Sequence, residues 1–138
     1  MSMELHPYLN FDGKTAEAMN FYAEALGGTL QIMRFGDSPM PVPPEHKDRV
    51  MHATLRTPGL TIMASDTMPG QPSTPGNTVH LSLNFSTVEE QDRVWEKLSP
   101  GATITMPLAQ QFFGRFGMLT DRYGNSWMFH FSAQAPQS

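Results

Sequence analysis

The same six-residue pattern occurs twice in this chain of 138 residues, once near the start and once beyond the middle. Residues 6–11 read HPYLNF and residues 80–85 read HLSLNF. A pattern that returns after about half the chain predicts two equivalent modules, because each repeat is one supersecondary unit. This duplication constrains the fold more than any other feature of the sequence.

Each copy alternates apolar and polar residues, which is the period-two pattern of a β-strand. The apolar positions are Leu5, Pro7, Leu9 and Phe11, and then Val79, Leu81, Leu83 and Phe85. The polar positions are His6, Tyr8 and Asn10, and then His80, Ser82 and Asn84. We expect the apolar sides to meet a helix and the polar sides to face one cleft. Because Pro7 cannot donate to a strand ladder, we expect either that the first strand lies at a sheet edge or that Pro7 faces away from the neighbouring strand.

A helix and three strands are predicted after each copy. Met19, Tyr22 and Leu26 have helical spacing, which predicts a helix over 15–26. A capping box at 87–90 predicts a second helix that ends near Leu98. The expected strands are 29–35, 50–57 and 60–66 in the first half, and 103–106, 116–120 and 126–131 in the second. Each half is therefore predicted to be a β-α-β-β-β module.

The predicted fold class is α+β, with a single domain over residues 1–138. Its parts are module one (4–66), a linker (67–77), module two (78–132) and a polar tail (133–138). The segment 36–49 contains four prolines, which neither a strand nor a helix interior tolerates. It is interpreted either as a lid over a site or as a long surface loop.

Composition excludes several classes of protein. The formal net charge of −4, without a basic stripe, argues against nucleic acid as a partner. The chain has no cysteine, so disulfides and thiolate chemistry are excluded. No leader sequence and no apolar run long enough for a membrane span are present, so no membrane partner and a cytoplasmic location are expected. The 11 methionines fit either core packing or the lining of an apolar site.

The candidate site is assigned to the polar sides of the two copies. His6, Tyr8, Asn10, His80, Ser82 and Asn84 are predicted to hold the polar end of a ligand. Met63 and Met128 are predicted to line the cleft, with His130 on the same face as Met128. Phe113 and Arg115 are assigned either to stacking a ring and holding an anion, or to a core or dimer contact. His52 is a weaker site candidate, and Asp66 is interpreted as a turn residue rather than a general base.

Several phrases resemble one branch of a known superfamily. They are Leu5-His6-Pro7-Tyr8-Leu9, Ala16-Glu17-Ala18 through Phe21-Tyr22 to Leu26-Gly27, Met63-Ala64-Ser65-Asp66, and the run from Leu119 to Met128. The chain resembles the vicinal oxygen chelate superfamily of glyoxalases, bleomycin-resistance proteins and extradiol dioxygenases, and its PhnB-like branch in particular. The resemblance implies paired modules whose mixed sheets curl around a cleft, within a homodimer.

The resemblance also implies a place for a metal ion. Family enzymes hold a divalent cation with residues of the first and last strand of each module, here His6, Met63, His80 and Met128. The last-strand positions usually carry glutamate, whereas this chain has methionine at both. Thioethers favour soft ions such as Cu(I), and a divalent cation needs carboxylate or imidazole ligands.

We therefore expect a protein that binds a small organic molecule in a cleft, without a tightly bound metal or other cofactor. The alternative is a metal-dependent lyase, isomerase or dioxygenase of the glyoxalase type that uses His6 and His80. A dimer without a ligand is a third interpretation. Relatives of the branch have carried a ubiquinone-biosynthesis methyltransferase name, but no glycine-rich turn for S-adenosylmethionine follows the first strand.

Overall fold

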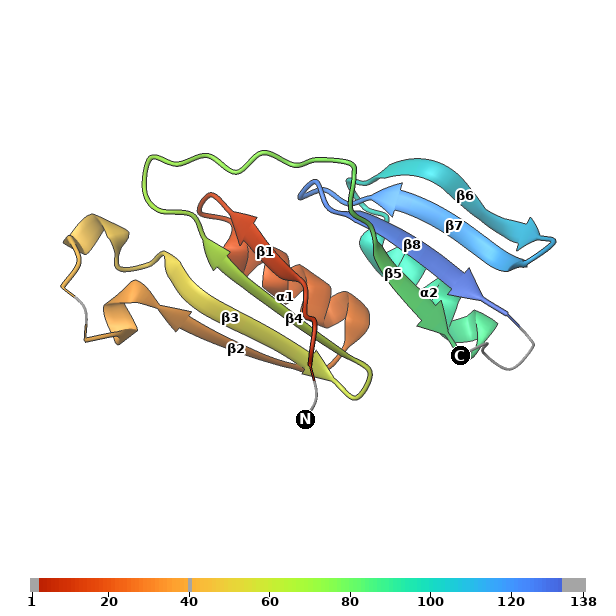
Figure 1. The fold of residues 1–138 in the computed structure, drawn as a ribbon, viewed down its shortest axis with the longest axis horizontal. Coiled ribbons are helices and arrows are strands. Elements are labelled where there is room, and N and C mark those ends of the chain that lie inside the picture. Colours follow the sequence, from red (N-terminus) through yellow and green to blue (C-terminus); the bar gives the residue numbers. More distant parts are fainter. Residues whose placement is uncertain (1–2, 40, 133–138) are drawn as a thin grey trace. The chain divides into compact units, whose positions relative to one another are not determined.

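The computed structural model describes residues 3–39 and 41–132. The chain divides into two compact units, Met1–Thr74 and Pro75–Ser138. Within the described residues, each unit contains one α-helix and one four-stranded sheet (Figure 1). The polar tail expected at 133–138 lies outside the described residues.

The first unit has a mixed sheet with the strand order β1-β4-β3-β2. Its elements are β1 (Tyr8–Phe11), α1 (Thr15–Leu26), β2 (Thr29–Arg34), the 3₁₀ turns η1 (Phe35–Asp37) and η2 (Pro44–His46), β3 (Val50–Thr57) and β4 (Leu60–Asp66). β1 pairs with β4 in parallel, and the other pairs are antiparallel. β1 lies at the sheet edge, as Pro7 predicts.

The second unit repeats this arrangement with the strand order β5-β8-β7-β6. Its elements are β5 (Leu81–Phe85), α2 (Val88–Leu98), β6 (Thr103–Gln111), β7 (Gly114–Thr120) and β8 (Ser126–Phe131). β5 and β8 are parallel, and both hairpin pairs are antiparallel. The α+β class and the two β-α-β-β-β modules are confirmed, and neither four-stranded sheet closes on itself.

The strand registers confirm that the two modules are equivalent residue by residue. Tyr8 pairs with Met63 between β1 and β4, and Ser82 pairs with Met128 between β5 and β8. Tyr8 and Ser82 are also the third residues of the two copies of the repeated sequence pattern. The repeat therefore extends from the sequence to the hydrogen-bonded ladder.

One face of each sheet packs against its helix. In the first unit, Met19 and Tyr22 of α1 and Leu55 of β3 are fully buried. In the second unit, Trp127 and Phe129 of β8 are fully buried. Burial of such side chains contributes roughly 1.5–3 kcal/mol each, so these two helix-covered faces form the cores of the units.

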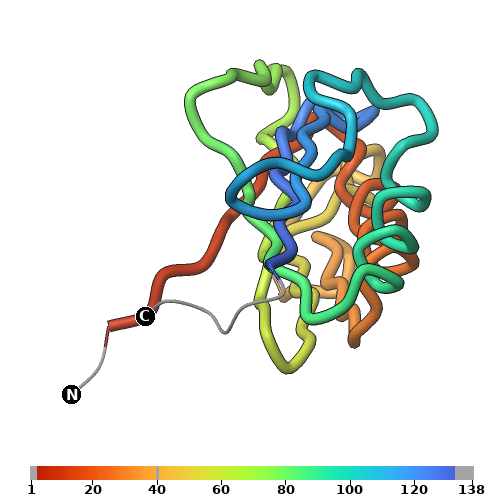
Figure 2. Tube along the Cα trace, turned by 90° about the vertical axis from the view of Figure 1, so that its right-hand side faces the viewer, coloured from red at the N-terminus to blue at the C-terminus, as the bar shows by residue number. Residues whose placement is uncertain are grey.

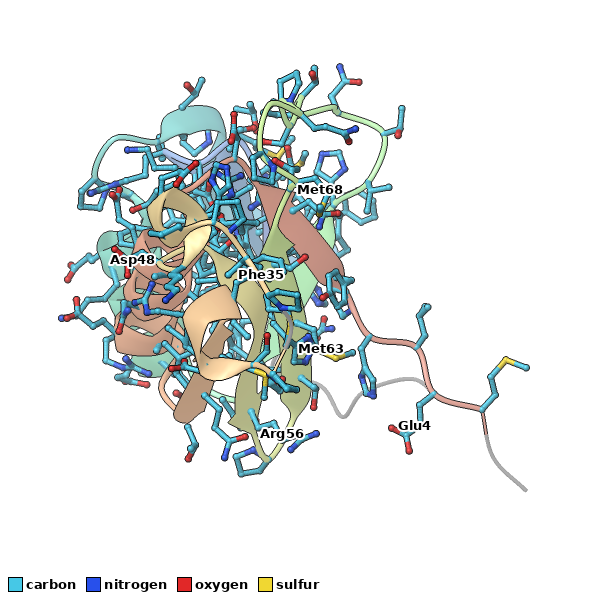
Figure 3. The ribbon with its side chains drawn as sticks, turned by 90° about the vertical axis from the view of Figure 1, so that its left-hand side faces the viewer. Glu4, Phe35, Asp48, Arg56, Met63 and Met68 are labelled. Carbon is cyan, nitrogen blue, oxygen red and sulfur yellow. The ribbon has the colours of Figure 1, made fainter. Side chains whose placement is uncertain are left out.

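The first strand of each module is shorter than its alternating pattern predicts. Leu5 is 94% exposed, so the expectation that it meets a helix is wrong, and Val79 in the second copy is 73% exposed. Pro7 explains the first case, because it accepts from the Met63 N–H at 3.0 Å but has no N–H with which to extend the ladder. The described residues before Pro7 run away from the sheet as an extended arm, which carries Glu4 (Figures 2 and 3).

The strand β6 is longer than predicted, nine residues instead of the expected segment 103–106. Its register shifts at two points, between Ile104 and Met106 and between Met106 and Ala109. Pro107 lies within it, which an edge strand permits because no second neighbour needs its missing N–H. The strand therefore continues through Pro107, beyond the expected end at Met106.

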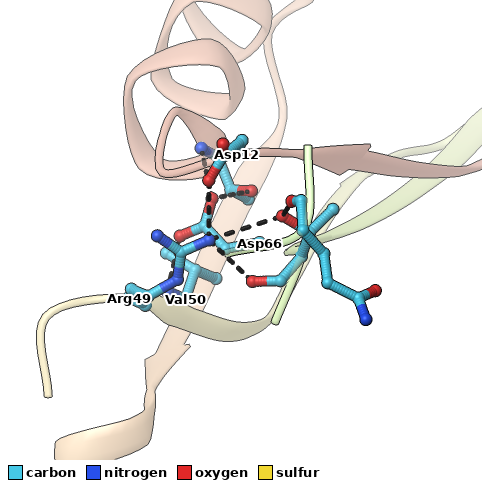
Figure 4. Close-up of polar contacts among 7 residues, drawn as sticks. Asp12, Arg49, Val50 and Asp66 are labelled. Carbon is cyan, nitrogen blue, oxygen red and sulfur yellow. Dashed lines mark hydrogen bonds and ion pairs between the residues drawn. The ribbon is translucent and has the colours of Figure 1, made fainter. Parts of the chain in front are cut away.

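The carboxylate of Asp66 joins three elements of the first unit (Figure 4). It accepts from the Thr15 N–H at 3.1 Å, the Thr15 hydroxyl at 2.8 Å and the Val50 N–H at 2.8 Å. Beside it, the Arg49 guanidinium contacts Asp12 at 3.0 Å and donates to the Thr67 carbonyl at 2.7 Å. Asp66 thus links the start of α1 to β3 at the end of β4, and Arg49 fixes the end of the proline-rich segment.

Candidate functional site

The face of each sheet opposite its helix, which we call the open face, carries the candidate site residues. Side chains of directly paired residues lie on the same face, and successive residues alternate between faces. Because Ala53 and Ala64 are paired and fully buried on the helix side, their neighbours His52, Thr54, Met63 and Ser65 lie on the open face.

A hydrogen-bonded chain of three protic side chains crosses the first open face. The Tyr8 hydroxyl lies 3.1 Å from Nδ1 of His52, and Nε2 of His52 lies 3.0 Å from the Thr54 hydroxyl. Whichever ring nitrogen carries the proton donates, and the other accepts. The imidazole is therefore fixed at both nitrogens, while Tyr8 remains 47% exposed.

A second polar pair lies on the same face, one step further along the strands. Nδ2 of Asn10 donates to the Ser65 hydroxyl at 3.1 Å, and these two residues are paired in the β1–β4 ladder. The Ser65 O–H and the other Asn10 N–H remain as donors. Together with Tyr8, they make the first open face rich in neutral hydrogen-bonding groups.

The second open face is mainly apolar at the equivalent positions. Ser82 pairs with Met128, Met128 with Met118, and Met118 with Met106, so one row across four strands carries three thioethers. Thr54 and Gln31 occupy the places of Met118 and Met106 in the first sheet.

An aromatic cluster surrounds His130 on this second face. The Phe113 ring stacks on the imidazole with centroids 6.1 Å apart, and it meets Phe116 edge to face at 5.4 Å. His130 also lies 3.3 Å from Oδ1 of Asn84 through Nδ1. A Cβ on Gly114 would lie 2.8 Å from Nε2 of His130, so only glycine allows this close packing. Phe113 is 45% exposed, so part of its ring is accessible to solvent.

The structure places the two repeated histidines outside their strands. His6 lies on the arm before β1, where its Nε2 contacts Glu4 at 2.8 Å. His80 precedes β5 and is exposed. The residues that pair with Met63 and Met128 are Tyr8 and Ser82, not the histidines.

Arg115 also lies apart from the open face. Its guanidinium contacts Asp92 of α2 at 2.7 Å and donates to Oε1 of the buried Gln91 at 3.0 Å. It therefore faces the helix layer, whereas Phe116 next to it pairs with His130 on the other side.

His52 is the functional candidate that sequence reasoning undervalued. The strand β3 begins Val-Met-His-Ala-Thr-Leu, in which apolar and polar residues do not alternate regularly, so the sequence does not assign a face to His52. The pair His52 and Thr54, two residues apart, was the available signal.

The donor atoms present do not fit a hard divalent cation. Such ions need carboxylate and imidazole ligands, whereas the paired first-strand and last-strand positions carry a phenol, a hydroxyl and two thioethers. The carboxylate of Asp66 is engaged by backbone N–H groups, and that of Asp121 accepts from Tyr123 N and Trp127 Nε1. Within the ranges that the structure describes, no three histidine, cysteine, aspartate or glutamate side chains gather as a metal site.

Comparison with known proteins decides the family. The family model described as 3-demethylubiquinone-9 3-methyltransferase matches residues 3–129. The chain belongs to this family. Protein PA1353 from Pseudomonas aeruginosa is 40% identical over 95% of this chain and 98% of its own, with a TM-score of 0.85. The PhnB protein from Bacillus cereus is 32% identical over 94% of this chain and 100% of its own, with a TM-score of 0.73.

The PhnB-like chain also shares its fold with the glyoxalase superfamily. A glyoxylase/bleomycin resistance protein/dioxygenase domain from Frankia sp. EAN1pec is 21% identical over 96% of this chain and 98% of its own, with a TM-score of 0.65. The resemblance inferred from the sequence is confirmed. In the described parts of this PhnB-like chain, no helix has the length and apolar character of a membrane span.

The methyl transfer in the family description requires a methyl donor such as S-adenosylmethionine. Nucleotide-like cofactors bind at glycine-rich turns between a strand and a helix. In the PhnB-like chain, the turn between β1 and α1 is Asp12-Gly13-Lys14, and the turn between β5 and α2 is Ser86-Thr87. These turns do not fit that cofactor.

Proposed function

We propose that this PhnB-like protein binds a small organic molecule with an apolar body and a polar end, without a tightly bound divalent metal. The observation that carries the proposal is that the two open faces have different side chains at equivalent strand positions. The first face presents the hydroxyl, imidazole and amide groups of Tyr8, His52 and Asn10. The second presents thioethers and the exposed ring of Phe113. Each face by itself combines thioether or aromatic side chains with a few polar groups, as small-molecule sites do.

The polar end of the ligand is assigned to Tyr8 and its neighbours. The fixed imidazole of His52 orients the Tyr8 hydroxyl at no further entropic cost on binding. Asn10 and Ser65 supply two more donors beside it. On the second open face, considered by itself, Phe113 and the methionines are assigned to an apolar group of a ligand, because thioethers adapt to irregular shapes. Ser82, Asn84 and His130 border that surface.

The protein is further proposed to work as a homodimer, by analogy with the superfamily. Sedimentation analysis of the purified chain is expected to give twice the mass of one polypeptide. A monomer at micromolar concentration would remove this part of the proposal and leave the open-face assignment standing.

A thermal-shift screen of metabolites and drugs tests ligand binding, with anilinonaphthalene sulfonate as a fluorescent probe of defined chemistry. A ligand raises the midpoint of unfolding by mass action. We expect Tyr8→Phe, for a ligand of the first open face, or Phe113→Ala, for a ligand of the second, to weaken binding of the best ligand by roughly tenfold, the cost of about 1.4 kcal/mol. His6→Gln, on the arm, and Phe112→Ala, on the same hairpin, are the matched controls. Equal losses in the controls would contradict the assignment to the open faces.

A further inference from the structure

Three methionines form a continuous row on the second open face. Met106 of β6 pairs with Met118 of β7, and Met118 pairs with Met128 of β8. Met106 is 38% exposed, and the other two are half-buried. Solvent therefore reaches this methionine row, defined by these three residues.

The spacing of the methionine row suits a single bound ion. Directly paired residues have Cβ atoms about 4.5–5.5 Å apart, and the flexible methionine side chain has three rotatable bonds. Three sulfurs around one ion in a plane lie about 4 Å apart when each bond is about 2.3 Å, the length found in metal–sulfur sites. The outer side chains, Met106 and Met128, need only lean toward the central Met118 to reach that spacing.

The chemistry of the row selects the ion. Thioethers are neutral, soft ligands that suit Cu(I) rather than Mg²⁺, Ca²⁺ or Mn²⁺. His130 lies two residues beyond Met128 on the same strand and face, and its ring nitrogens contact Asn84 and Phe113 at the long distances of 3.3 and 3.4 Å. We propose that the methionine row is a Cu(I)-binding site, with His130 as an additional ligand within reach. This inference goes beyond the proposed organic ligand and uses a different property of the same side chains.

The first sheet provides an internal comparison for this site. Its equivalent row reads Gln31, Thr54 and Met63, with one thioether instead of three. The duplicated scaffold therefore predicts one Cu(I) site per chain, on the second sheet only.

Competition with a coloured chelator tests the proposal on the full chain. Anaerobic titration against the Cu(I)–bicinchoninate complex, with ascorbate present, is expected to transfer one equivalent of Cu(I) per chain. Met118→Leu keeps the apolar volume but removes the central sulfur, and it is expected to lower Cu(I) affinity at least tenfold. Met63→Leu, on the first sheet, is expected to bind as the unmodified chain does.

Ag(I), which does not change oxidation state, gives an independent readout. In the ¹³C-methyl-methionine spectrum, one equivalent is expected to shift the resonances of Met106, Met118 and Met128 and leave that of Met63 in place. No transfer of Cu(I), binding of several ions with unchanged affinity in Met118→Leu, or equal loss in Met63→Leu would each overturn the proposal. Tyr8→Phe, which removes only a hydroxyl of the first open face, is expected to bind Cu(I) as the unmodified chain does, so its separate effect on the organic ligand distinguishes this test from that of the proposed function.

Discussion

Replacing the buried carboxylate of Asp66 tests how the first unit is held together. Asp66 is 7% exposed, and its oxygens accept from two backbone N–H groups and one hydroxyl. The donors belong to Thr15 and Val50, which are 0% and 1% exposed. In Asp66→Ala, all three donors lose this acceptor.

The magnitude follows from the count of donors. A buried donor without a partner costs about 1–3 kcal/mol, and water that enters the vacated space offsets part of the loss. We expect Asp66→Ala to lower the free energy of unfolding by about 4 kcal/mol, and Asp66→Asn, which keeps one acceptor oxygen, by about 2 kcal/mol. Asp12→Ala in the same cluster removes a half-exposed ion pair with Arg49 and should cost about 0.5 kcal/mol.

Urea unfolding measures these differences, and the tryptophans separate the two units. Far-ultraviolet circular dichroism follows the whole chain, whereas Trp95 and Trp127, the 2 tryptophans of the sequence, report the second unit. The dichroism midpoint should move more than the fluorescence midpoint if the units unfold separately, and both should move together if they are coupled. Equal effects of Asp66→Ala and Asp12→Ala would refute the reasoning.

Three further substitutions probe the second unit, each read by urea unfolding. Gly114→Ala places a Cβ 2.6 Å from the Phe131 carbonyl at a φ of +144°, so it should lower the free energy of unfolding by about 2 kcal/mol and shift the His130 resonances. The control is Gly59→Ala, whose Cβ would have no atom within 4 Å, and its free energy of unfolding should stay within about 1 kcal/mol of that of the unmodified chain. Trp127→Phe loses the 2.7 Å bond from Nε1 to Asp121 and part of a buried ring, at a cost of about 3 kcal/mol; a loss below 1 kcal/mol would contradict this account. Thr87→Ala removes the side-chain cap on the Glu90 N–H, and about 1 kcal/mol should be lost and then restored by Thr87→Ser.

Most of the fold could be predicted from the sequence because local signals and the repeat agree. The helix over 15–26 and the strands 50–57, 60–66 and 126–131 have the predicted bounds. Their ends coincide with strong local breaks, such as the turn at Pro58-Gly59. The repeat then predicted the same order of helix and strands in both modules, which the pattern of one segment alone could not do.

The errors in the fold have a common origin in strand pairing. Leu5 and Val79 continue the alternating pattern beyond the residues that have a paired strand. An alternating pattern predicts the direction of a side chain but not whether another element buries it. The strand β6 shows the opposite error, because its pairing to β7 continues through Pro107 and two register shifts.

The candidate site was less predictable than the fold. Within each sheet, alternation predicted the face opposite the helix for Tyr8 and Asn10 in the first unit and for Ser82 in the second. It did not indicate whether His6 or His52 lies beside Tyr8. The difference arises from contacts between residues 44 positions apart, Tyr8 and His52, which no local pattern records. The alternatives for Arg115 could not be weighed for the same reason, since its partners Gln91 and Asp92 lie on the preceding helix.

Because the two sheets have matching registers, side chains of one sheet can be introduced at the equivalent positions of the other. Because alternate residues belong to opposite surfaces, the side chains at Gln31 and Thr54 can be exchanged for those at Met106 and Met118 without altering the helix-packed layer. A chain with Gln31→Met and Thr54→Met would carry the same thioether trio in both halves. In this double variant both sheets would carry three methionines in equivalent positions. The expected result is two equivalents of Cu(I) bound per chain instead of one.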